Sequence, residues 1–265
     1  MDIALVEYIN TRPFMDGLES GLTDPDIRCH LMPPAACAQA LRTGAAQVAL
    51  IPVGALPDLP GIQLLPGYCI GADGPVHSVF LVGKTPIGQW DHLVLDSHSR
   101  SSNALATVLL RRYWKTELPA YQPDTRAFHL IKDKTGGVII GDEAIRMRHL
   151  YPYVYDLAEV WKTLTGLPFV FAVWAYRHES CPPAVLDRIV ACLGEGVAQA
   201  EASARRWASY YGLDPVFARM YLTRYISYPF DQAKQEALAL FQQWMKADMA
   251  GYHVPNSAVQ RDYQV

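Results

Sequence analysis

Polar side chains gather where three predicted strands end. The first group closes an apolar run at residues 3–9, the second follows Leu93–Asp96, and the third follows Val138–Ile140. In open α/β sheets, ligands bind in the crevice at the carboxyl ends of the strands, so these groups are candidates for one binding site. Their members are Tyr8, Asn10, Thr11 and Arg12; Ser97, Ser99, Arg100, Ser101 and Ser102; and Gly141 and Asp142.

The serine-rich turn at residues 97–102 precedes a predicted helix at Asn103–Leu118. Hydroxyl groups and free backbone N–H groups at a helix N-terminus together bind anions well. Ordinary N-capping would need only one of the four serines, so we favour an anion site here. For Asp142 two interpretations stand side by side, a cap on the helix that follows and a ligand-binding role.

The usual signatures of nucleotide, metal or serine-hydrolase chemistry are missing from the sequence. It contains no GxGxxG, Walker loop, HExxH or GxSxG, and its eight histidines are scattered. The five cysteines include no CxxC pair, so neither a zinc site nor a disulfide framework is expected. We interpret most of them as small core residues.

Composition and charge exclude several classes of partner. The 265 residues are 51% hydrophobic, which is enough for a sizeable core, and the net charge is −3. No long basic run is present, so nucleic acid is not expected as a partner. No apolar stretch reaches the roughly 18 residues of a membrane span, so no membrane contact is expected. The opening MDIALVEY has no basic region, which predicts a cytoplasmic protein without a signal peptide. No feature predicts an oligomeric state.

The spacing of apolar residues predicts an α/β protein with a helical C-terminal tail. Strands are expected at 3–9, 27–31, 48–53, 64–70, 77–83, 93–96, 128–131, 138–140, 153–156 and 167–176. Helices are expected from Pro34 to a cap at Gly44, at 103–118 and 143–149, between the last two strands, and through most of the final third, where Asp231 is a candidate N-cap.

Two α/β units of this kind predict two lobes with a ligand-binding cleft between them. The extended stretches near 83–90 and 170–177 are the expected crossovers. Residues 1–85 together with 177–265 would then form one lobe, and 86–176 the other.

Six segments also carry a family resemblance when they are taken in order. They are EYINTRPF (7–14), VALIP (48–52), YCIGADGPVHSVFL (68–81), LDSHSRSSNAL (95–105), VIIGDEAI (138–145) and YDLAEVWKTLTGLPFVFAVW (155–174). The set resembles the MqnA and MqnD family of menaquinone-biosynthesis proteins, and MqnA members most. Glu7 departs from the pattern, because serine is usual there, and Ser101-Ser102 replaces the more usual Thr-Ser.

The resemblance implies a periplasmic-binding-protein-like fold of the two-crossover type (type II), in agreement with the predicted lobes. It implies chorismate dehydratase activity, in which chorismate loses water to give 3-[(1-carboxyvinyl)oxy]benzoate in the futalosine route to menaquinone. It implies no metal and no organic cofactor. The expected partner is therefore a small dicarboxylate.

With chorismate as substrate, the candidate residues acquire expected roles. Ser101 and Ser102 would bind one carboxylate and Arg12 the other. Asn10 can donate and accept hydrogen bonds, so it would hold the departing hydroxyl or the developing anion. Further substrate contacts are expected from Tyr8, Thr11, Ser78, Arg100, Gly141 and Phe169, the last as an apolar wall.

The group that removes the ring proton has two candidates. One is the enolpyruvyl carboxylate of the substrate itself, held by Asn10 and Ser78. The other is Asp142 acting as a general base.

Other functions remain as alternatives to this interpretation. A solute-binding protein for a small anion would share the fold, because fold alone does not give function. The missing signal peptide speaks against that class, and the missing helix-turn-helix segment speaks against a transcription regulator. An MqnD-type naphthoate synthase is disfavoured because the distinct S-P-C-P-N-D-type opening is absent.

Overall fold

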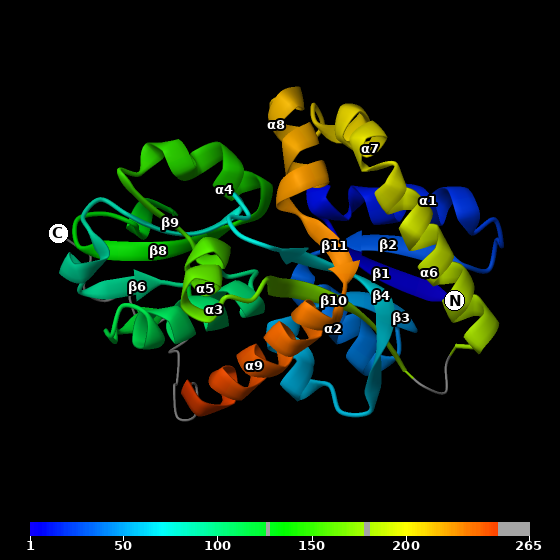
Figure 1. Cartoon of the computed structure of the whole chain (residues 1–265), viewed down its shortest axis with the longest axis horizontal. Coiled ribbons are helices and arrows are strands. Elements are labelled where there is room, and N and C mark those ends of the chain that lie inside the picture. Colours follow the sequence, from blue (N-terminus) through cyan, green and yellow to red (C-terminus); the bar gives the residue numbers. More distant parts are fainter. Residues whose placement is uncertain (126–127, 178–180, 249–265) are drawn as a thin grey trace.

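A computed structural model describes residues 1–125, 128–177 and 181–248. The chain forms two β-sheets that lie side by side, each covered by helices (Figure 1). The strand order is β11-β4-β10-β3-β1-β2 in the first sheet and β7-β6-β8-β5-β9 in the second. We call each sheet with its own helices a lobe, lobe 1 for the first sheet and lobe 2 for the second.

Lobe 1 combines a parallel core with antiparallel strands. Strand β1 pairs in parallel with β2 and β3, whereas β10 runs antiparallel to both β3 and β4. Its strands are β1 (Asp2–Val6), β2 (Arg28–Met32), β3 (Val48–Pro52), β4 (Ile62–Ala72), β10 (Phe169–Arg177) and β11 (Ser227–Phe230). Its helices are α1 (Arg12–Gly21), α2 (Pro34–Thr43), α6 (Pro183–Ala198), α7 (Ala200–Trp207) and α8 (Pro215–Met220).

Lobe 2 is the smaller unit. Strand β6 is parallel to β7 and β8, and β5 is antiparallel to β8 and β9. Its strands are β5 (Val79–Gly83), β6 (His92–Val94), β7 (Ala120–Tyr121), β8 (Thr135–Ile140) and β9 (Tyr153–Asp156). Its helices are α3 (Arg100–Arg112), α4 (Gly141–Met147) and α5 (Leu157–Thr165).

Two sheets with helices confirm the predicted α/β class, but the lobes divide the chain at other points than predicted. Strand β5 belongs to the second sheet, although the predicted lobe 1 ran to residue 85. Strand β10 belongs to the first sheet, although it was predicted within 86–176. The connections between the sheets therefore fall at 73–78 and 157–168, the second of them containing α5. Residues 178–180 and 249–265 of the predicted range 177–265 lie outside the described residues.

Several element predictions are confirmed by cap geometry. Gly44 ends α2 with φ +80°, and Pro34 stands in its first turn. Asp231 accepts a hydrogen bond from the backbone N–H of Lys234 at 3.0 Å, at the start of α9 (Gln232–Asp248). Asp156 caps α5 in the same way through the N–H of Ala158, at 3.0 Å.

Four elements differ from the predictions. Residues 128–131, predicted as a strand, contain a 3-10 turn at Phe128–Leu130. Helix α1 and strands β7 and β11 were not predicted. Helix α1 follows the 3-10 turn Ile9–Thr11 without a break, so no turn signal marks its start. Strand β11 contains Pro229, which lowers strand propensity but is tolerated at the edge of a sheet, where β11 lies.

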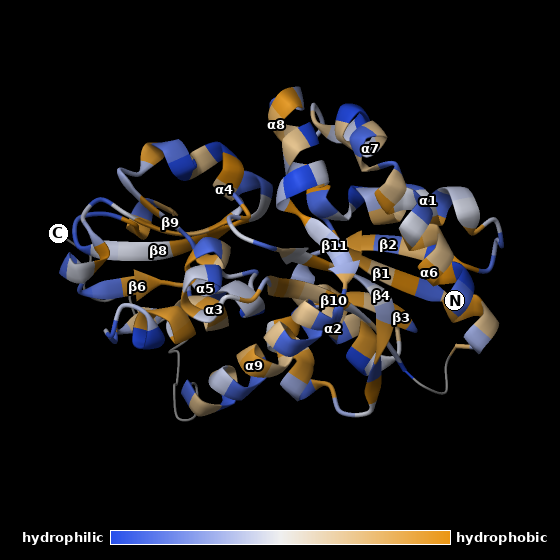
Figure 2. Cartoon of the chain, in the orientation of Figure 1, coloured by the Kyte–Doolittle hydropathy of each residue, from blue (hydrophilic) through white to orange (hydrophobic). Residues whose placement is uncertain are grey.

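The core lies along the strands of both sheets, several of which are coloured as hydrophobic in Figure 2. All residues of β3 are buried. Trp161 is fully buried, and its indole N–H donates to the carbonyl of Pro168 at 2.9 Å. The helices predicted in the final third contribute Ile189, Leu193 and Ala204 to the core, and none of these side chains is exposed. All five cysteines are free, and Cys29 alone among them is not fully buried.

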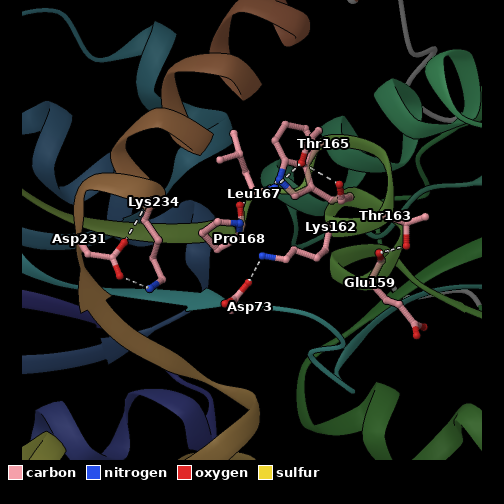
Figure 3. A network of polar contacts seen from close by, with 10 residues as sticks. Asp73, Glu159, Lys162, Thr163, Thr165, Leu167, Pro168, Asp231 and Lys234 are labelled. Atoms are coloured by element: carbon pink, nitrogen blue, oxygen red, sulfur yellow. Dashed lines mark hydrogen bonds and ion pairs between the residues drawn. The ribbon is translucent and has the colours of Figure 1, made fainter.

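Figure 3 shows two ion pairs near the second connection, one made by Lys162 and one by Lys234. Lys162 of α5 pairs with Asp73, which follows β4, at 2.6 Å. Lys234 is buried and reaches Asp231 at 3.4 Å. At its far end, α9 contacts α3 of lobe 2, where Arg112 makes two hydrogen bonds to Asp248 at 2.5 and 2.9 Å. Both connections and α9 therefore restrain the relative position of the lobes. Among the described residues, no helix has the length and apolar composition needed to cross a bilayer.

Candidate functional site

A cavity, part of it open to solvent, lies between the lobes at the ends of strands from both sheets. Most of its surface is apolar, and its lining holds no charged side chain among the described residues. Its polar residues are Tyr8, Asn10, Thr11, Ser78, Ser99, Ser101 and Ser102, and its other lining residues include Gly141 and Phe171. An anion in this cavity would therefore be held by hydroxyl, amide and backbone N–H groups rather than by a cation.

The segment after β1 supplies the first polar group. The backbone turns sharply into the 3-10 turn Ile9–Thr11. Thr11 stabilises that turn because its hydroxyl lies 2.5 Å from the carbonyl of Val6 and 2.9 Å from that of Tyr8. The same turn places Asn10 in the cavity wall, where its amide nitrogen donates to the phenolic oxygen of Tyr221 at 3.4 Å.

The first connection and the end of β8 supply the second group. Ser78 is 3% exposed and accepts a hydrogen bond from the hydroxyl of Tyr221 at 2.8 Å. The N–H of Gly141 donates to the carbonyl of Ser78 at 2.8 Å. Gly141 has φ +71°, and a Cβ there would lie 2.8 Å from a ring carbon of Tyr8, so only glycine fits.

The start of α3 supplies the third group. Ser99 is its N-cap and accepts from the backbone N–H of Ser102 at 3.1 Å. Ser101 accepts from the N–H of Gly54 at 3.0 Å and donates to the carbonyl of Phe171 at 2.9 Å. Its single proton is thereby committed to the protein, so Ser101 holds α3 against lobe 1.

The hydrogen bonds of the described residues leave three cavity hydroxyl protons without an acceptor in the protein. They belong to Ser78, Ser99 and Ser102. Two of these groups come from the start of α3 and the third from the first connection, and all three converge on one cavity.

Four predicted site residues lie outside the cavity lining. Arg12 is buried against lobe 1, with its guanidinium 4.0 Å from the ring centre of Trp207 and its Nε 2.6 Å from the hydroxyl of Tyr211. Arg100 forms an exposed ion pair with Asp58. Neither arginine faces the cavity, so their expected substrate contacts gain no support from this geometry.

Asp142 and Phe169 are the other two. Asp142 lies in the first turn of α4, and the cap position is occupied by Ile140. The carboxylate of Asp142 accepts a hydrogen bond from the N–H of Ile9 at 3.3 Å. It borders a second hollow, beside the first, that also includes Glu7 and Arg146. Phe169 is buried in an aromatic cluster, 5.2 Å from Trp161 between ring centres. The aromatic wall of the cavity is Phe171 instead.

Sequence patterns missed Tyr221, which joins Asn10 to Ser78 and is fully buried. Burial raises its pKa above the ordinary tyrosine value, so it stays protonated at neutral pH. It lies 143 residues from Ser78, and no local pattern marks it. Its position in a π-helical turn, Tyr221–Tyr225, is a feature of the backbone alone.

Two titratable groups lie next to Ser78. The backbone N–H of His77 donates to Asp156 at 2.7 Å, and the imidazole lies 3.2 Å from a guanidinium nitrogen of Arg148. Burial, opposed by backbone hydrogen bonds, raises the pKa of Asp156 to about 6. Burial and the charge of Arg148 lower the pKa of His77. No group of three or more His, Cys, Asp or Glu side chains in the described part of the chain is arranged to hold a metal ion.

Solved structures share this fold at low sequence identity. A protein from Archaeoglobus fulgidus is 16% identical with a TM-score of 0.72, over 93% of this chain and 96% of that one. A Candida albicans protein described as exhibiting the generic periplasmic binding protein structural fold is 10% identical with a TM-score of 0.67, over 96% and 91%. The alkanesulfonate-binding protein of Xanthomonas axonopodis pv. citri, bound to MOPS, is 11% identical with a TM-score of 0.62, over 96% and 94%. The periplasmic-binding-protein-like fold expected from the sequence is therefore confirmed.

Sequence comparison adds a nearer relative and a family. A Thermus thermophilus protein named chorismate dehydratase is 32% identical over 183 residues, which span 61% of this chain and 65% of that protein, just under two thirds of its length. A family described as Menaquinone biosynthesis matches residues 1–247, nearly the whole chain. The resemblance seen in the sequence motifs is confirmed by this match, and the chain belongs to the menaquinone biosynthesis family.

Proposed function

We propose that this protein is a chorismate dehydratase, a carbon–oxygen lyase that removes water from chorismate to give 3-[(1-carboxyvinyl)oxy]benzoate. The ring loses one C–H proton and the hydroxyl group, which leave together as water, and it becomes aromatic. Support comes from the family, from the Thermus thermophilus relative, and from a largely apolar cavity with a small set of convergent polar groups. In the organism, this reaction would belong to the futalosine route, and the protein would act in the cytoplasm.

The observation that carries the proposal is the pairing of Asn10 with Ser78 across the cavity wall. Both are hydrogen-bonded to Tyr221, so their polar atoms are held in fixed positions before a ligand arrives. The product is much more stable than chorismate, so the reaction needs no external driving force. The enzyme has to favour elimination over rearrangement and over loss of pyruvate, and a fixed geometry of the polar groups does this.

The proton-removing group is proposed to be the enolpyruvyl carboxylate of the substrate. Ser78 would donate to that carboxylate and hold it beside the ring hydrogen, and the amide oxygen of Asn10 would accept a hydrogen bond from the ring hydroxyl that departs. The other carboxylate would lie at the start of α3, near the hydroxyls of Ser99 and Ser102. In this arrangement the cavity needs no carboxylate of its own, in keeping with its uncharged lining.

Identification of the product tests the proposal. Chorismate is incubated with the protein, and the product is separated and compared by mass and ultraviolet absorbance with authentic 3-[(1-carboxyvinyl)oxy]benzoate. We expect that compound alone. A rearranged isomer of chorismate, or a benzoate without the enolpyruvyl group, would contradict the proposal.

A solute-binding function is the second candidate, because the structural relatives include an alkanesulfonate-binding protein. A binding protein would hold a small anion and return it unchanged. Equilibrium dialysis followed by recovery of the ligand distinguishes the two, since a binding protein releases intact chorismate whereas a dehydratase does not.

A further inference from the structure

The phenolic oxygen of Tyr221 lies between two polar side chains of the cavity. It donates to the hydroxyl oxygen of Ser78 at 2.8 Å and accepts from the amide nitrogen of Asn10 at 3.4 Å. A phenol has one proton, so the bond to Ser78 leaves only lone pairs for Asn10. The hydrogen bonds therefore run in one direction, from Asn10 through Tyr221 to Ser78.

This direction determines what the two side chains offer a ligand. Ser78 accepts a proton from Tyr221, so its own proton remains for donation within the cavity that it lines. Asn10 turns its amide nitrogen toward Tyr221, which leaves its carbonyl oxygen as an acceptor on the other side of the amide group. Without the phenolic oxygen, both groups could rotate, and neither role would be fixed.

The surroundings of Tyr221 keep its oxygen in place. The side chain is fully buried and its ring stacks on Phe217, with ring centres 5.9 Å apart and planes 15° from parallel. It opens the π-helical turn Tyr221–Tyr225, and such turns occur frequently at functional sites. A second tyrosine from the same part of the chain, Tyr228, donates to the backbone carbonyl of Asn10 at 3.0 Å.

We propose that Tyr221 is a positioning residue for the reaction, which orders Asn10 as an acceptor and Ser78 as a donor through its single hydroxyl group. The catalytic consequence rests on the proposed function. Because Tyr221 does not line the cavity, it acts through the other two residues and not by contact with the substrate.

The test replaces Tyr221 by Phe, which removes one oxygen and retains the ring that packs on Phe217. We expect kcat for chorismate to fall by about tenfold or more, with KM changed by less than about threefold, because misplaced groups weaken the transition state more than the ground state. Tyr155→Phe is the matched control. It likewise removes a single phenol oxygen, from a half-buried tyrosine of lobe 2 that accepts from the N–H of Ile87 at 3.2 Å. This variant should keep the wild-type kcat.

A double-mutant cycle distinguishes positioning from a general loss of stability. Because Tyr221 acts through Ser78 and also through Asn10, Ser78→Ala combined with Tyr221→Phe should lower kcat by less than the product of the two single effects. Full additivity of the two effects, or an unchanged kcat in Tyr221→Phe, would overturn the proposal. The proposal would also be overturned if Tyr155→Phe and Tyr221→Phe lowered the melting temperature and kcat by the same amounts.

A structural readout separates this proposal from the proposed function. Nuclear magnetic resonance of the side-chain amide of Asn10 reports its order whether or not chorismate is turned over. We expect slow hydrogen exchange of that amide in the wild type and in Tyr155→Phe, and exchange at least about tenfold faster in Tyr221→Phe. Rapid exchange in the wild type itself would overturn the proposal, even if Tyr221→Phe failed to fold. An ordered amide without chorismate turnover would contradict the proposed function alone.

Discussion

The backbone N–H of Ile9 donates to both carboxylate oxygens of Asp142, at 3.3 and 3.4 Å. Ile9 belongs to lobe 1 and Asp142 to lobe 2, so the contact joins the loop of Asn10 to the start of α4. Asp142 is 7% exposed and borders the hollow beside the main cavity rather than the cavity itself. The position of this carboxylate fits a contact between lobes better than a proton acceptor for the ligand.

Replacing Asp142 by Asn tests that role. The amide oxygen of Asn can still accept from Ile9, whereas the amide cannot act as a base at neutral pH. We expect kcat within about threefold of wild type, because the hydrogen bond between the lobes is retained. A loss of about 100-fold or more in steady-state turnover would instead identify Asp142 as the base.

Asn10→Ala removes the one amide side chain that the described part of the chain places in the cavity lining. Its contribution is expected in the transition state, where the ring proton and the hydroxyl depart, so kcat should fall by about 100-fold or more. Binding of 3-[(1-carboxyvinyl)oxy]benzoate, measured by calorimetry, should change much less. If KM alone rose, Asn10 would be a binding residue without a role in the chemical step.

Ser101 and Ser102 are adjacent but should behave differently. Ser102→Ala removes a hydroxyl whose proton has no acceptor in the described protein, so product binding should weaken by about tenfold, the value of one hydrogen bond to a charged group. Ser101→Ala leaves the N–H of Gly54 and the carbonyl of Phe171 without their partner, so it should lower the free energy of unfolding by about 1–3 kcal/mol with affinity nearly unchanged. Calorimetry and denaturant unfolding of both variants measure these effects, and the reverse pattern would refute the assignment.

Asp156 makes stability depend on pH. Its pKa of about 6 in the folded protein is above the ordinary value of 3.8, because burial disfavours the charged form. A raised pKa adds stability that is complete below about pH 4 and is lost as pH rises through about 6. The difference in unfolding free energy between wild type and Asp156→Asn should therefore fall by on the order of 2–3 kcal/mol between pH 4 and 7. A difference that stayed constant or grew over this range would show that the pKa is not raised.

Local patterns in the sequence predicted much of the fold. The apolar run of β3, the proline and glycine that bound α2, and the cap residue Asp231 depend on neighbours within a few positions, so periodicity and capping rules locate them. The division into lobes was less accurate, because β5 and β10 join their sheets through partners distant in sequence.

The site was predicted in part, for a related reason. Strand ends identified Asn10 and the serines of the turn, and the family resemblance added Ser78. The structure brings these residues to one cavity, with Ser99, Ser101 and Ser102 of the turn in its lining. The sequence could not show whether Phe169 or Phe171 faces the cavity. Strand β10 pairs with β4 through register shifts, and these are visible only in the paired backbone. The side chain of Arg12 is directed by α1 toward Trp207 and Tyr211, which follow almost 200 residues later in the chain.

Turnover of chorismate by a substoichiometric amount of the protein tests the central claim most directly. The protein is incubated with a large excess of chorismate in the presence of a metal chelator, and both chorismate and the benzoate product are quantified over time. The proposed function predicts that the product accumulates in many-fold molar excess over the protein. One product molecule should form for each chorismate consumed, and its mass should be lower than that of chorismate by one water. Recovery of all the chorismate unchanged would contradict it.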